Sequence, residues 1–401
     1  MTKRAVVKGV GHYLPKRIVP NSEFEETLNT SNDWIITRSG IKQRHFSSED
    51  ETTSKMAILA GKQAIEDANI KVSDLDAIIL ATSTADLTFP SAATMVQAGL
   101  GMRHGFAYDV QAVCAGFIFA LSTANAQIVS GQANRILVIG SETFSNLMDW
   151  NDRSTCVLFG DGAGAVVLEG QNSNGTKEDR GILSVDLNSD GSFRDILYVD
   201  GGVSQKTTGY LRMEGKEVFK HAVRRFKEVI LEGLDYNNLS VDDVNMLIPH
   251  QANYRISQTV QKQLDIDQDK VFSNIHNYGN TTAASIGIAL SEALEQNKIN
   301  KVVGILNGTS NYILSEMENS NKNFSDVLKK AQKLGYAEPD NPKLDLNGFD
   351  AFAKVRILSA LAFNNKISKH KCLMEGIEKI DLKDIKIANQ LGLRVKLLGI
   401  S

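Results

Sequence analysis

The sequence predicts an α/β fold of two similar halves, followed by an incomplete α+β segment. Short apolar runs that are typical of buried strands alternate with helical stretches up to about residue 300. A polar, glycine-containing connector at 171–178 separates two halves that each repeat this alternation. The runs are AIILATST (77–84), RILVIGSE (135–142), CVLFGDGAGAVVLEG (156–170), VNMLIPHQ (244–251) and KVFSNIHNYG (270–279).

Composition indicates an ordinary globular protein. The 401 residues are 42% hydrophobic, and a chain of this length forms roughly two to three domains. The formal net charge of −3 and the lack of long basic runs argue against a nucleic-acid or membrane-surface protein. The start of the chain lacks the apolar region of a signal peptide, and no run reaches the roughly 20 apolar residues of a membrane helix. We therefore expect a cytoplasmic location.

Three cysteines, Cys114, Cys156 and Cys372, are too few and too scattered for a disulfide framework or a four-thiolate metal site. No metal site is predicted. Each cysteine is therefore interpreted as a packing residue or a nucleophile.

Three regions are predicted along the chain: 1–170, which carries Cys114, 171–302, and 303–401. After residue 314 the sequence becomes helix-dominated and rich in lysine. No low-complexity tract marks the boundary near 302, so the junction is abrupt and contains no flexible spacer.

Cys114 is a candidate nucleophile because of its position. It directly precedes a run rich in Ala, Phe, Ile and Leu that predicts a long buried helix. A thiol at a helix N-terminus faces unpaired N–H groups and the positive end of the helix dipole, which lowers its pKa. The small neighbours Ala115 and Gly116 leave room for an acyl group. The alternative is that Cys114 is a small buried core residue.

His250 and Asn280 follow two of the predicted strands in the second half. A residue at the end of a strand can face a cleft in an α/β sheet, and histidine can exchange protons near neutral pH. The alternatives are a structural loop histidine for His250 and a helix cap for Asn280.

Together these three stretches resemble the condensing enzymes of the thiolase superfamily, and most closely β-ketoacyl-[acyl-carrier-protein] synthase III, over roughly residues 1–302. The resemblance implies a thiolase-like fold of two similar halves with mixed sheets and layered helices. Further matching motifs, in the same order as in the family, are NDWIITRSGIKQRH (32–45), TFPSAA (88–93), RSTCVLFGDGAGAVVL (153–168), MEGKEVFKHAV (213–223) and HQANYRI (250–256).

The resemblance implies an acyltransferase that initiates fatty acid synthesis. Cys114 would take an acyl group, expected to be acetyl, from acyl-CoA, and malonyl-carrier protein would then lose CO₂ to give an enolate. His250 and Asn280 would donate hydrogen bonds to the developing charge. The expected partners are acyl-CoA, an acyl carrier protein and a second copy of the chain. No metal or redox cofactor is expected.

The resemblance also assigns binding residues. Trp34 and Arg153 match positions that sandwich the CoA adenine, and a guanidinium over an aromatic ring is physically reasonable. Phe89 matches an aromatic residue of the acyl pocket that is contributed across the family's dimer interface. The remaining matches are Arg38 and Asn253 in the CoA channel, and Lys220, Arg255 and Lys262 on the face that receives the carrier protein. The alternative for Lys220 and Lys262 is a solvated surface charge.

Residues 302–401 resemble a different family, the catalytic region of homoserine dehydrogenase. The matching motifs are VVGILNGTSNYIL (302–314), LGYAEPDNPKLDLNGFDAFAKVRIL (334–358) and MEGIEKIDLKDIKIANQLGLRVKLLGIS (374–401). The matched homoserine-site residues are Gly308, Thr309, Glu338, Asp345, Asp350 and Lys354. No G-x-G-x-x-G motif follows an opening strand, so no NAD(P) site and no dehydrogenase activity are expected. Asp350 and Lys354 are then interpreted as a helix-surface ion pair.

Two alternatives to an active synthase remain. In the family, a glycine-rich turn and a final strand follow the last helix, and a glycine N–H there helps to form the oxyanion hole. Here that glycine cluster is absent. The chain could therefore be an acyl-CoA-binding scaffold that does not turn over, or two fused gene fragments.

Overall fold

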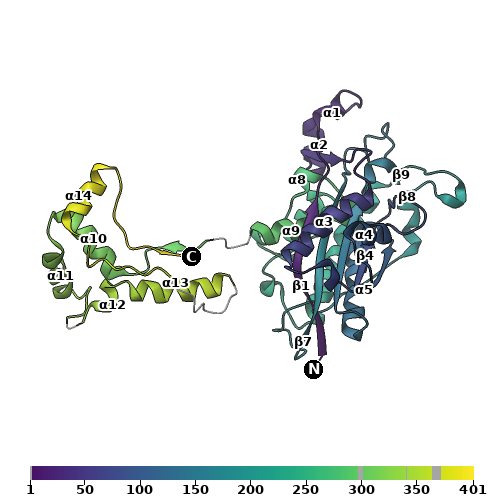
Figure 1. Cartoon of the computed structure of the whole chain (residues 1–401). Helices are drawn as coiled ribbons and strands as arrows, with labels where there is room; N and C mark the ends of the chain where they lie inside the picture. Colours follow the sequence, from purple (N-terminus) through teal and green to yellow (C-terminus); the bar gives the residue numbers. More distant parts are fainter. Residues whose placement is uncertain (1, 297–300, 340, 364–371) are drawn as a thin grey trace. The chain divides into compact units, whose positions relative to one another are not determined.

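The computed structural model describes residues 2–296, 301–339, 341–363 and 372–401. They form two compact units, Met1–Gln296 and Asn297–Ser401 (Figure 1). The predicted regions 1–170 and 171–302 thus lie almost entirely within one unit, and the division falls a few residues before the predicted boundary at 302.

The first unit is built on a mixed five-stranded sheet. The strand order is β1-β7-β6-β4-β5. β4 is parallel to both β5 and β6, whereas β7 is antiparallel to β6 and β1. The bounds are β1 (Thr2–Tyr13), β4 (Ala77–Ala81), β5 (Phe106–Val110), β6 (Arg135–Glu142) and β7 (Gly162–Ser173). The three apolar runs of the first half therefore do form central strands, as predicted.

Helices cover both faces of this sheet. Ile78 and Leu80 of β4 point to the face covered by α3 (Thr53–Asp67) and α4 (Ala92–Leu100). Ile79 points to the opposite face, which is covered by α5 (Gly116–Ser130) and the N-terminal turn of α9 (Ser285–Gln296). This alternation follows from the two-residue period of a strand.

The segment Val113–Ser130, which includes α5, is the one helical stretch among the described residues that is long and apolar enough to cross a membrane. It packs on β1, β4 and β6 through Phe117, Ala120 and Ala124, which are fully buried. A core helix has the same composition.

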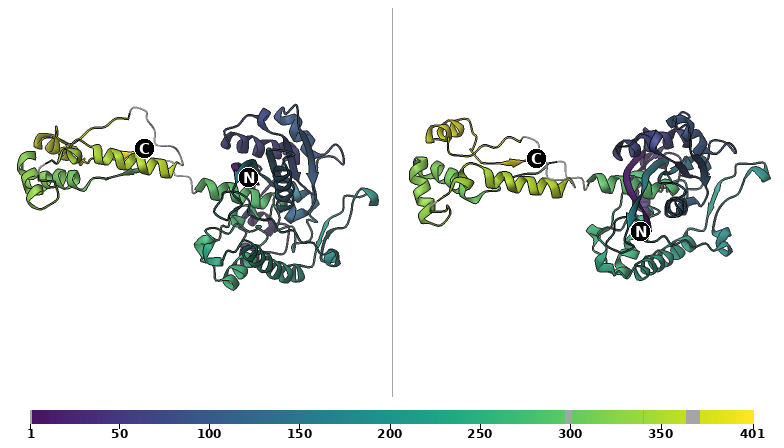
Figure 2. Two further views of the ribbon diagram at one scale, coloured as in Figure 1. Left: turned by 90° about the horizontal axis from the view of Figure 1, so that it is seen from below. Right: turned by 60° about the horizontal axis from the view of Figure 1, so that its bottom comes forward.

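Helix α6 and several short elements complete the first unit. α6 is the long helix on its outside (Figure 2). The bounds are β2 (Arg17–Pro20), α1 (Ser22–Glu25), α2 (Asn32–Ser39), β3 (Gln43–Phe46), β8 (Leu197–Val199), β9 (Leu211–Met213), α6 (Gly215–Tyr236), α7 (Tyr254–Leu264) and α8 (Ile275–Tyr278). β2 pairs with β3, and β8 pairs with β9.

The strands predicted in the second half are wrong. Neither 244–251 nor 270–279 forms a β-strand. Only an isolated parallel bridge joins Leu247 to Val271, and the latter run ends in the helix α8. An apolar run becomes a strand only where neighbouring strands pair with its backbone. The run after α9 supplies no such neighbour, because β10 (Val303–Gly304) pairs with β11 (Gly399–Ile400) in the second unit.

The second unit is mostly helical, as predicted for the chain after residue 314. Its core is formed by Ile313, Leu314, Met317 and Val327, all nearly inaccessible to solvent. Besides β10 and β11, its elements are α10 (Gly308–Ser320), α11 (Phe324–Lys333), α12 (Lys343–Leu346), α13 (Phe349–Ala362) and α14 (Leu382–Gln390).

Candidate active site

Cys114 lies in a 3-10 turn, Val113–Ala115, directly before α5. The position at a helix N-terminus is as predicted. Val113, immediately before it, has a φ of +47°, which is unusual for a β-branched residue. Strained residues of this kind persist where the surrounding structure holds them, and they concentrate at functional sites. The turn presents the half-buried Cys114 to a cavity.

His250 follows Pro249, and its side chain has one polar partner among the described residues. Its Nδ1 lies 2.5 Å from the Ser285 hydroxyl oxygen at the start of α9. Its Nε2 is buried and has no hydrogen-bond partner in the described part of the chain. Burial lowers the pKa of His250 to about 4, so the imidazole is neutral at neutral pH. A buried, unpartnered ring nitrogen is suited to proton transfer with a substrate.

Asn280 is fixed by its backbone and by one side-chain bond. Its N–H donates to the Leu158 carbonyl at 2.8 Å, and its carbonyl accepts from the Gly160 N–H at 3.0 Å. Its Oδ1 accepts from the Thr282 N–H at 2.9 Å. The side-chain NH₂ has no acceptor among the described residues and is available to donate to a ligand. The N-cap of the short turn Thr282–Ala284 is Thr281, so the interpretation of Asn280 as a helix cap is wrong.

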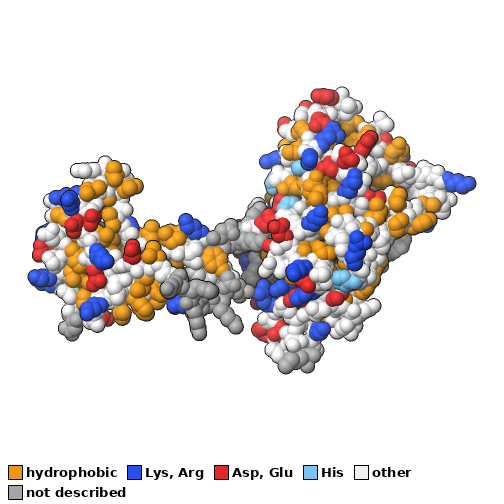
Figure 3. Space-filling model, in the orientation of Figure 1, with side chains coloured by type: hydrophobic (Ala, Val, Ile, Leu, Met, Phe, Trp, Pro, Cys, Tyr) orange, Lys and Arg blue, Asp and Glu red, His pale blue; other side chains and the backbone are white. Residues whose placement is uncertain are grey.

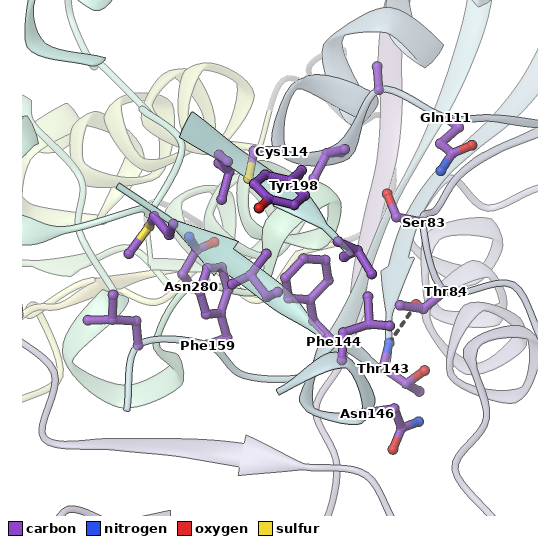
Figure 4. A pocket seen from close by; sticks show the side chains of 18 of the residues that line it. Ser83, Thr84, Gln111, Cys114, Thr143, Phe144, Asn146, Phe159, Tyr198 and Asn280 are labelled. Carbon is purple, nitrogen blue, oxygen red and sulfur yellow. Dashed lines mark hydrogen bonds between the residues drawn. The ribbon is translucent and has the colours of Figure 1, made fainter. Parts of the chain in front are cut away.

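The three residues line one cavity with a volume of about 1450 Å³. Figure 4 shows Cys114 and Asn280 among its side chains. Apolar side chains from α6 and polar groups from the loop after β4 complete the wall. The cavity therefore joins a thiol, an imidazole and an amide donor from the two halves of the unit. No group of three or more His, Cys, Asp or Glu side chains suited to a metal ion occurs within the described ranges.

The predicted lowering of the Cys114 pKa is wrong in direction. Burial, together with the nearby Glu142 carboxylate, raises the pKa of Cys114 to about 12. These effects outweigh the helix N-terminus. The thiol is therefore protonated at neutral pH in the free protein, and its attack on a thioester requires a base.

Glu142 is a buried acid at the end of β6 that the sequence reasoning missed. It is completely buried and accepts hydrogen bonds from the Ser83 N–H at 3.1 Å and the Thr84 hydroxyl at 2.6 Å. Burial raises the pKa of Glu142 to about 7. The available signal was an acidic residue at the carboxyl end of an otherwise apolar strand. Ser285 was also missed, and a serine before a helix gives no specific signal.

The residues predicted to contact CoA form one cluster. The ring of Trp34 on α2 lies close to two guanidinium groups, that of Arg38 at 4.4 Å and that of Arg153 at 5.0 Å from the ring centroid. Asn253, the N-cap of α7, donates to the Arg38 carbonyl at 3.0 Å and also lines the cavity. The cluster is thus linked to the cavity that holds Cys114.

The other predicted residues of the first unit lie outside the cavity wall. The Phe89 side chain is 83% exposed. Lys220 on α6 forms a salt bridge with Glu217, and the Arg255 guanidinium lies 5.6 Å from the Phe219 ring. Lys262 lies in the last turn of α7. On the face seen in Figure 3, basic and acidic side chains are interspersed over this unit.

In the second unit, the missed residue Asn307 brings two of the predicted acids together. Its side-chain NH₂ donates to Asp345 at 2.8 Å and to Asp350 at 2.9 Å. Lys354 donates to Asp350 at 2.8 Å, and this hydrogen bond lowers the pKa of Asp350. The signal for Asn307 was an N-cap residue before a helix.

The remaining predicted residues of this unit have structural contacts. Gly308 is the first residue of α10, and the Thr309 hydroxyl donates to the Tyr336 carbonyl at 2.5 Å. The described contact of Glu338 is through its backbone carbonyl.

Family models match both parts of the chain. The model described as 3-oxoacyl-[acyl-carrier-protein (ACP)] synthase III matches residues 108–191, and its C-terminal model matches 234–306. The homoserine dehydrogenase model matches 286–401. Residues 286–306 are therefore matched by both families, which explains why the sequence passes through the junction without a visible break.

Individual proteins match the first unit over most of their own length. Those from Ruegeria pomeroyi and Roseobacter denitrificans, both named beta-ketoacyl-[acyl-carrier-protein] synthase III, are each 63% identical over 291 residues, which is 73% of this chain and 90% of the relative. The crystal structure of 3-oxoacyl-[acyl-carrier-protein] synthase III from Aquifex aeolicus is 44% identical, with a TM-score of 0.69 over 75% of this chain and 94% of that one. The chain therefore belongs to the β-ketoacyl-[acyl-carrier-protein] synthase III family, whose thiolase-like α/β fold its first unit has, and it continues into a segment that matches homoserine dehydrogenase.

Proposed function

We propose that the first unit condenses an acyl-CoA primer, acetyl-CoA in the simplest case, with malonyl-carrier protein through an acyl-Cys114 intermediate. The observation that carries this proposal is the convergence of Cys114, His250 and Asn280 on one cavity. Membership of the synthase family supports the choice of substrates.

The first step is transfer of the acyl group to Cys114. Because the pKa of the thiol is raised to about 12, the neutral His250 accepts the thiol proton at Nε2 as the sulfur attacks the thioester carbonyl. The bond from the carbonyl carbon to the CoA sulfur breaks, and CoA leaves as its thiol after taking up that proton. The Ser285 hydroxyl can donate to or accept from Nδ1, so it supports either tautomer.

The second step joins two carbons. The malonyl thioester loses CO₂, and the negative charge that develops on its thioester oxygen receives hydrogen bonds from His250 Nε2–H and the Asn280 side-chain amide. The enolate carbon then forms a bond to the acyl carbonyl carbon, the bond from that carbon to the Cys114 sulfur breaks, and the leaving thiolate takes up a proton from solvent. Removal of one such donor typically lowers the rate about 10²–10³-fold. The proposed chemistry uses no metal or redox cofactor.

We assign substrate binding to the clusters around this cavity. Trp34 and Arg153 hold the adenine, and Arg38 and Asn253 follow the pantetheine channel. Lys220, Arg255 and Lys262 on α6 and α7 receive an acidic carrier protein. A homodimer in the cytoplasm, in which Phe89 reaches the partner's acyl pocket, belongs to the same proposal.

One observation favours a second function, namely an acyl-CoA binder that does not turn over. The second half of the first unit contains only the bridge between Leu247 and Val271 where paired strands are predicted. If the backbone that carries His250 and Asn280 is held less firmly, Cys114 can be acylated but condensation does not follow. We assign no dehydrogenase activity to the second unit and interpret Asp350 and Lys354 as a surface ion pair.

Mass spectrometry of the intact protein distinguishes these functions. After incubation with acetyl-CoA, the proposed synthase gains an acetyl adduct that is lost in Cys114→Ala and retained in Cys156→Ala. Addition of malonyl-carrier protein removes the adduct and yields the ketoacyl product. An adduct that persists supports the binder, and folded protein without any adduct contradicts both functions.

A further inference from the structure

Arg212 on β9 joins two loops that belong to the proposed substrate site. Its Nη1–H group donates to Asp149 Oδ2 at 2.9 Å, and its Nε–H group donates to Asp200 Oδ2 at 2.7 Å. Asp149 lies in the loop after the 3-10 turn Phe144–Leu147, and Asp200 directly follows β8. One guanidinium therefore bridges two carboxylates that are far apart in the sequence.

The hairpin that carries Arg212 forms part of the cavity wall. Its strands β8 and β9 pair antiparallel. Leu211 and Met213, the two neighbours of Arg212 in the sequence, line the cavity that contains Cys114. Figure 4 shows Tyr198 of β8 among the side chains of the same cavity. The position of Arg212 is therefore fixed by a hairpin that shapes the site.

Asp200 orients the guanidinium on this hairpin. The Asp200 N–H donates to the Tyr210 carbonyl at 3.0 Å, and Asp200 Oδ1 accepts from the Tyr210 N–H at 2.6 Å. The bond from the Tyr210 N–H, followed by that from Arg212, lowers the pKa of Asp200. One carboxylate thus holds both the backbone of the hairpin and the Arg212 side chain, which leaves Nη1–H to reach the neighbouring loop.

Asp149 belongs to the same loop as Arg153. The Asp149 carbonyl accepts from the Asp152 N–H at 2.9 Å, and Asp149 Oδ1 accepts from the Asn151 N–H at 3.1 Å. These turns connect Asp149 rigidly to Arg153, whose guanidinium lies 5.0 Å from the centroid of the Trp34 ring. The position of Asp149 therefore influences the position of Arg153.

The loop depends on side-chain contacts because residues 148–153 form neither helix nor strand. The hydrogen bond from Arg212 is the main cause that lowers the pKa of Asp149, so the carboxylate is charged at neutral pH. Asp149 and Asp200 both contact one guanidinium. Without that cation the two negative charges would repel each other, and the loop would move away from the hairpin.

We propose that Arg212 is a positioning residue for acyl-CoA binding, because it holds the loop 148–153 on the β8–β9 hairpin and so keeps Arg153 beside Trp34. This inference rests on the proposed function, in which Trp34 and Arg153 hold the adenine. Arginine suits the role because its planar fork presents separate N–H donors to two carboxylates, whereas lysine presents a single point charge.

Calorimetric titration of the full chain with CoA tests the bridge. Arg212→Gln should weaken CoA binding about fivefold, which is near the upper limit for a partly exposed ion pair. Asp149→Asn keeps the Oδ1 atom that accepts from Asn151 and should weaken binding by a similar factor. The double variant should bind CoA no more weakly than Arg212→Gln, because both changes break the same bridge.

A second measurement separates positioning of the adenine site from a general loosening of the cavity. Acetyl-pantetheine has the same thioester as acetyl-CoA but lacks the adenine nucleotide. In Arg212→Gln, the ratio of the acetylation rate of Cys114 with sub-saturating acetyl-CoA to the rate with acetyl-pantetheine should fall about fivefold. Arg135→Gln is the control, because it breaks a 2.6 Å ion pair with Glu169 in the first sheet and should leave this ratio and the CoA affinity unchanged.

Three results overturn this inference and leave the proposed function in place. One is equal CoA affinity of Arg212→Gln and the natural chain. Another is an equal loss of both acetylation rates, which would show that the whole cavity is loosened. The last is a loss in the double variant that equals the product of the two single losses. If the natural chain neither binds CoA nor gains an acetyl adduct, the proposed function fails, and this inference fails with it.

Discussion

At the scale of single residues, the candidate site contains two titratable groups whose pKa values are shifted in opposite directions. Burial lowers the pKa of His250 to about 4, so the imidazole is neutral at neutral pH. Burial raises the pKa of Glu142 to about 7. Glu142 is completely buried, and both side chains contact hydroxyl groups that fix their orientation. Pairs of groups with pKa values displaced in this way are common in active sites.

The contact between Ser285 and His250 should matter for rate more than for stability. Ser285→Ala removes the partner of His250 Nδ1 and should lower the condensation rate about 10–100-fold, because the imidazole loses its fixed orientation. The chain offers a matched control on the same helix, since the buried Ser291 contacts His12 Nδ1 at 2.9 Å. Ser291→Ala should cost similar stability without loss of rate. Equal rate losses, measured with malonyl-carrier protein, would show that Ser285 acts only through the fold.

Glu142 and His250 should make opposite contributions to the pH dependence of stability. The ordinary pKa values are 4.5 for Glu142 and 6.5 for His250. Between these two pH values, unfolding releases a proton from Glu142 and adds a proton to His250. Glu142 therefore makes the free energy of unfolding fall as pH rises, and His250 makes it rise, each by about 1.4 kcal/mol per pH unit. Their effects cancel in the natural chain.

Glu142→Gln removes one of these opposing effects. The free energy of unfolding of this variant should rise with pH about 1.4 kcal/mol per unit more steeply than that of the natural chain. Urea unfolding at pH 5 and pH 6.5 measures the difference. Parallel pH profiles for the two proteins would contradict the raised pKa of Glu142.

At the scale of elements, close backbone contact places α9 against the first sheet. An ideal Cβ atom at Gly164 of β7 would lie 2.4 Å from the Gly287 carbonyl carbon. An ideal Cβ atom at Gly287 would lie 2.9 Å from the Gly164 carbonyl carbon. Only glycine allows this approach. Because Ser285 begins α9, the same contact positions the histidine partner. The sequence shows both glycines but gives no sign that they meet.

Gly287→Ala should therefore destabilise the protein. Alanine favours a helix over glycine by about 1 kcal/mol, but the added Cβ would clash with β7, and such overpacking costs about 1–3 kcal/mol. A lower free energy of unfolding in urea would therefore show that the clash with β7 outweighs the gain in helix propensity. Gly191→Ala is the control, because its Cβ would meet open space and its φ lies outside the left-handed region. A stabilised Gly287→Ala variant would contradict the close contact.

At the scale of the whole molecule, the cavity residues all belong to the first unit. The second unit has its own core and its own buried polar residues, among them Asn307, which is 3% exposed. Damage to one unit should therefore leave the chemistry of the other intact.

Asn307→Ala tests this independence. It leaves Asp345 and Asp350 without a buried donor, which costs about 1–3 kcal/mol. Differential scanning calorimetry should show one transition shifted down and the other unchanged, with normal acetylation of Cys114. Asn323→Ala is the control, because Asn323 is exposed and makes no side-chain cap bond. A single shared transition that moves as a whole would contradict two independent units.

The sequence by itself determined the strand alternation of the first half, the position of Cys114 before α5, and the family of each part, because these depend on local periodicity and ordered motifs. The tertiary structure decided what depends on neighbours. Burial reversed the predicted direction of the Cys114 pKa. The tertiary structure also placed Glu142 and Ser285 at the site, which the sequence did not indicate. The apolar runs at 244–251 and 270–279 did not become paired strands, because a strand requires a partner for its backbone, and the chain after α9 pairs within the second unit.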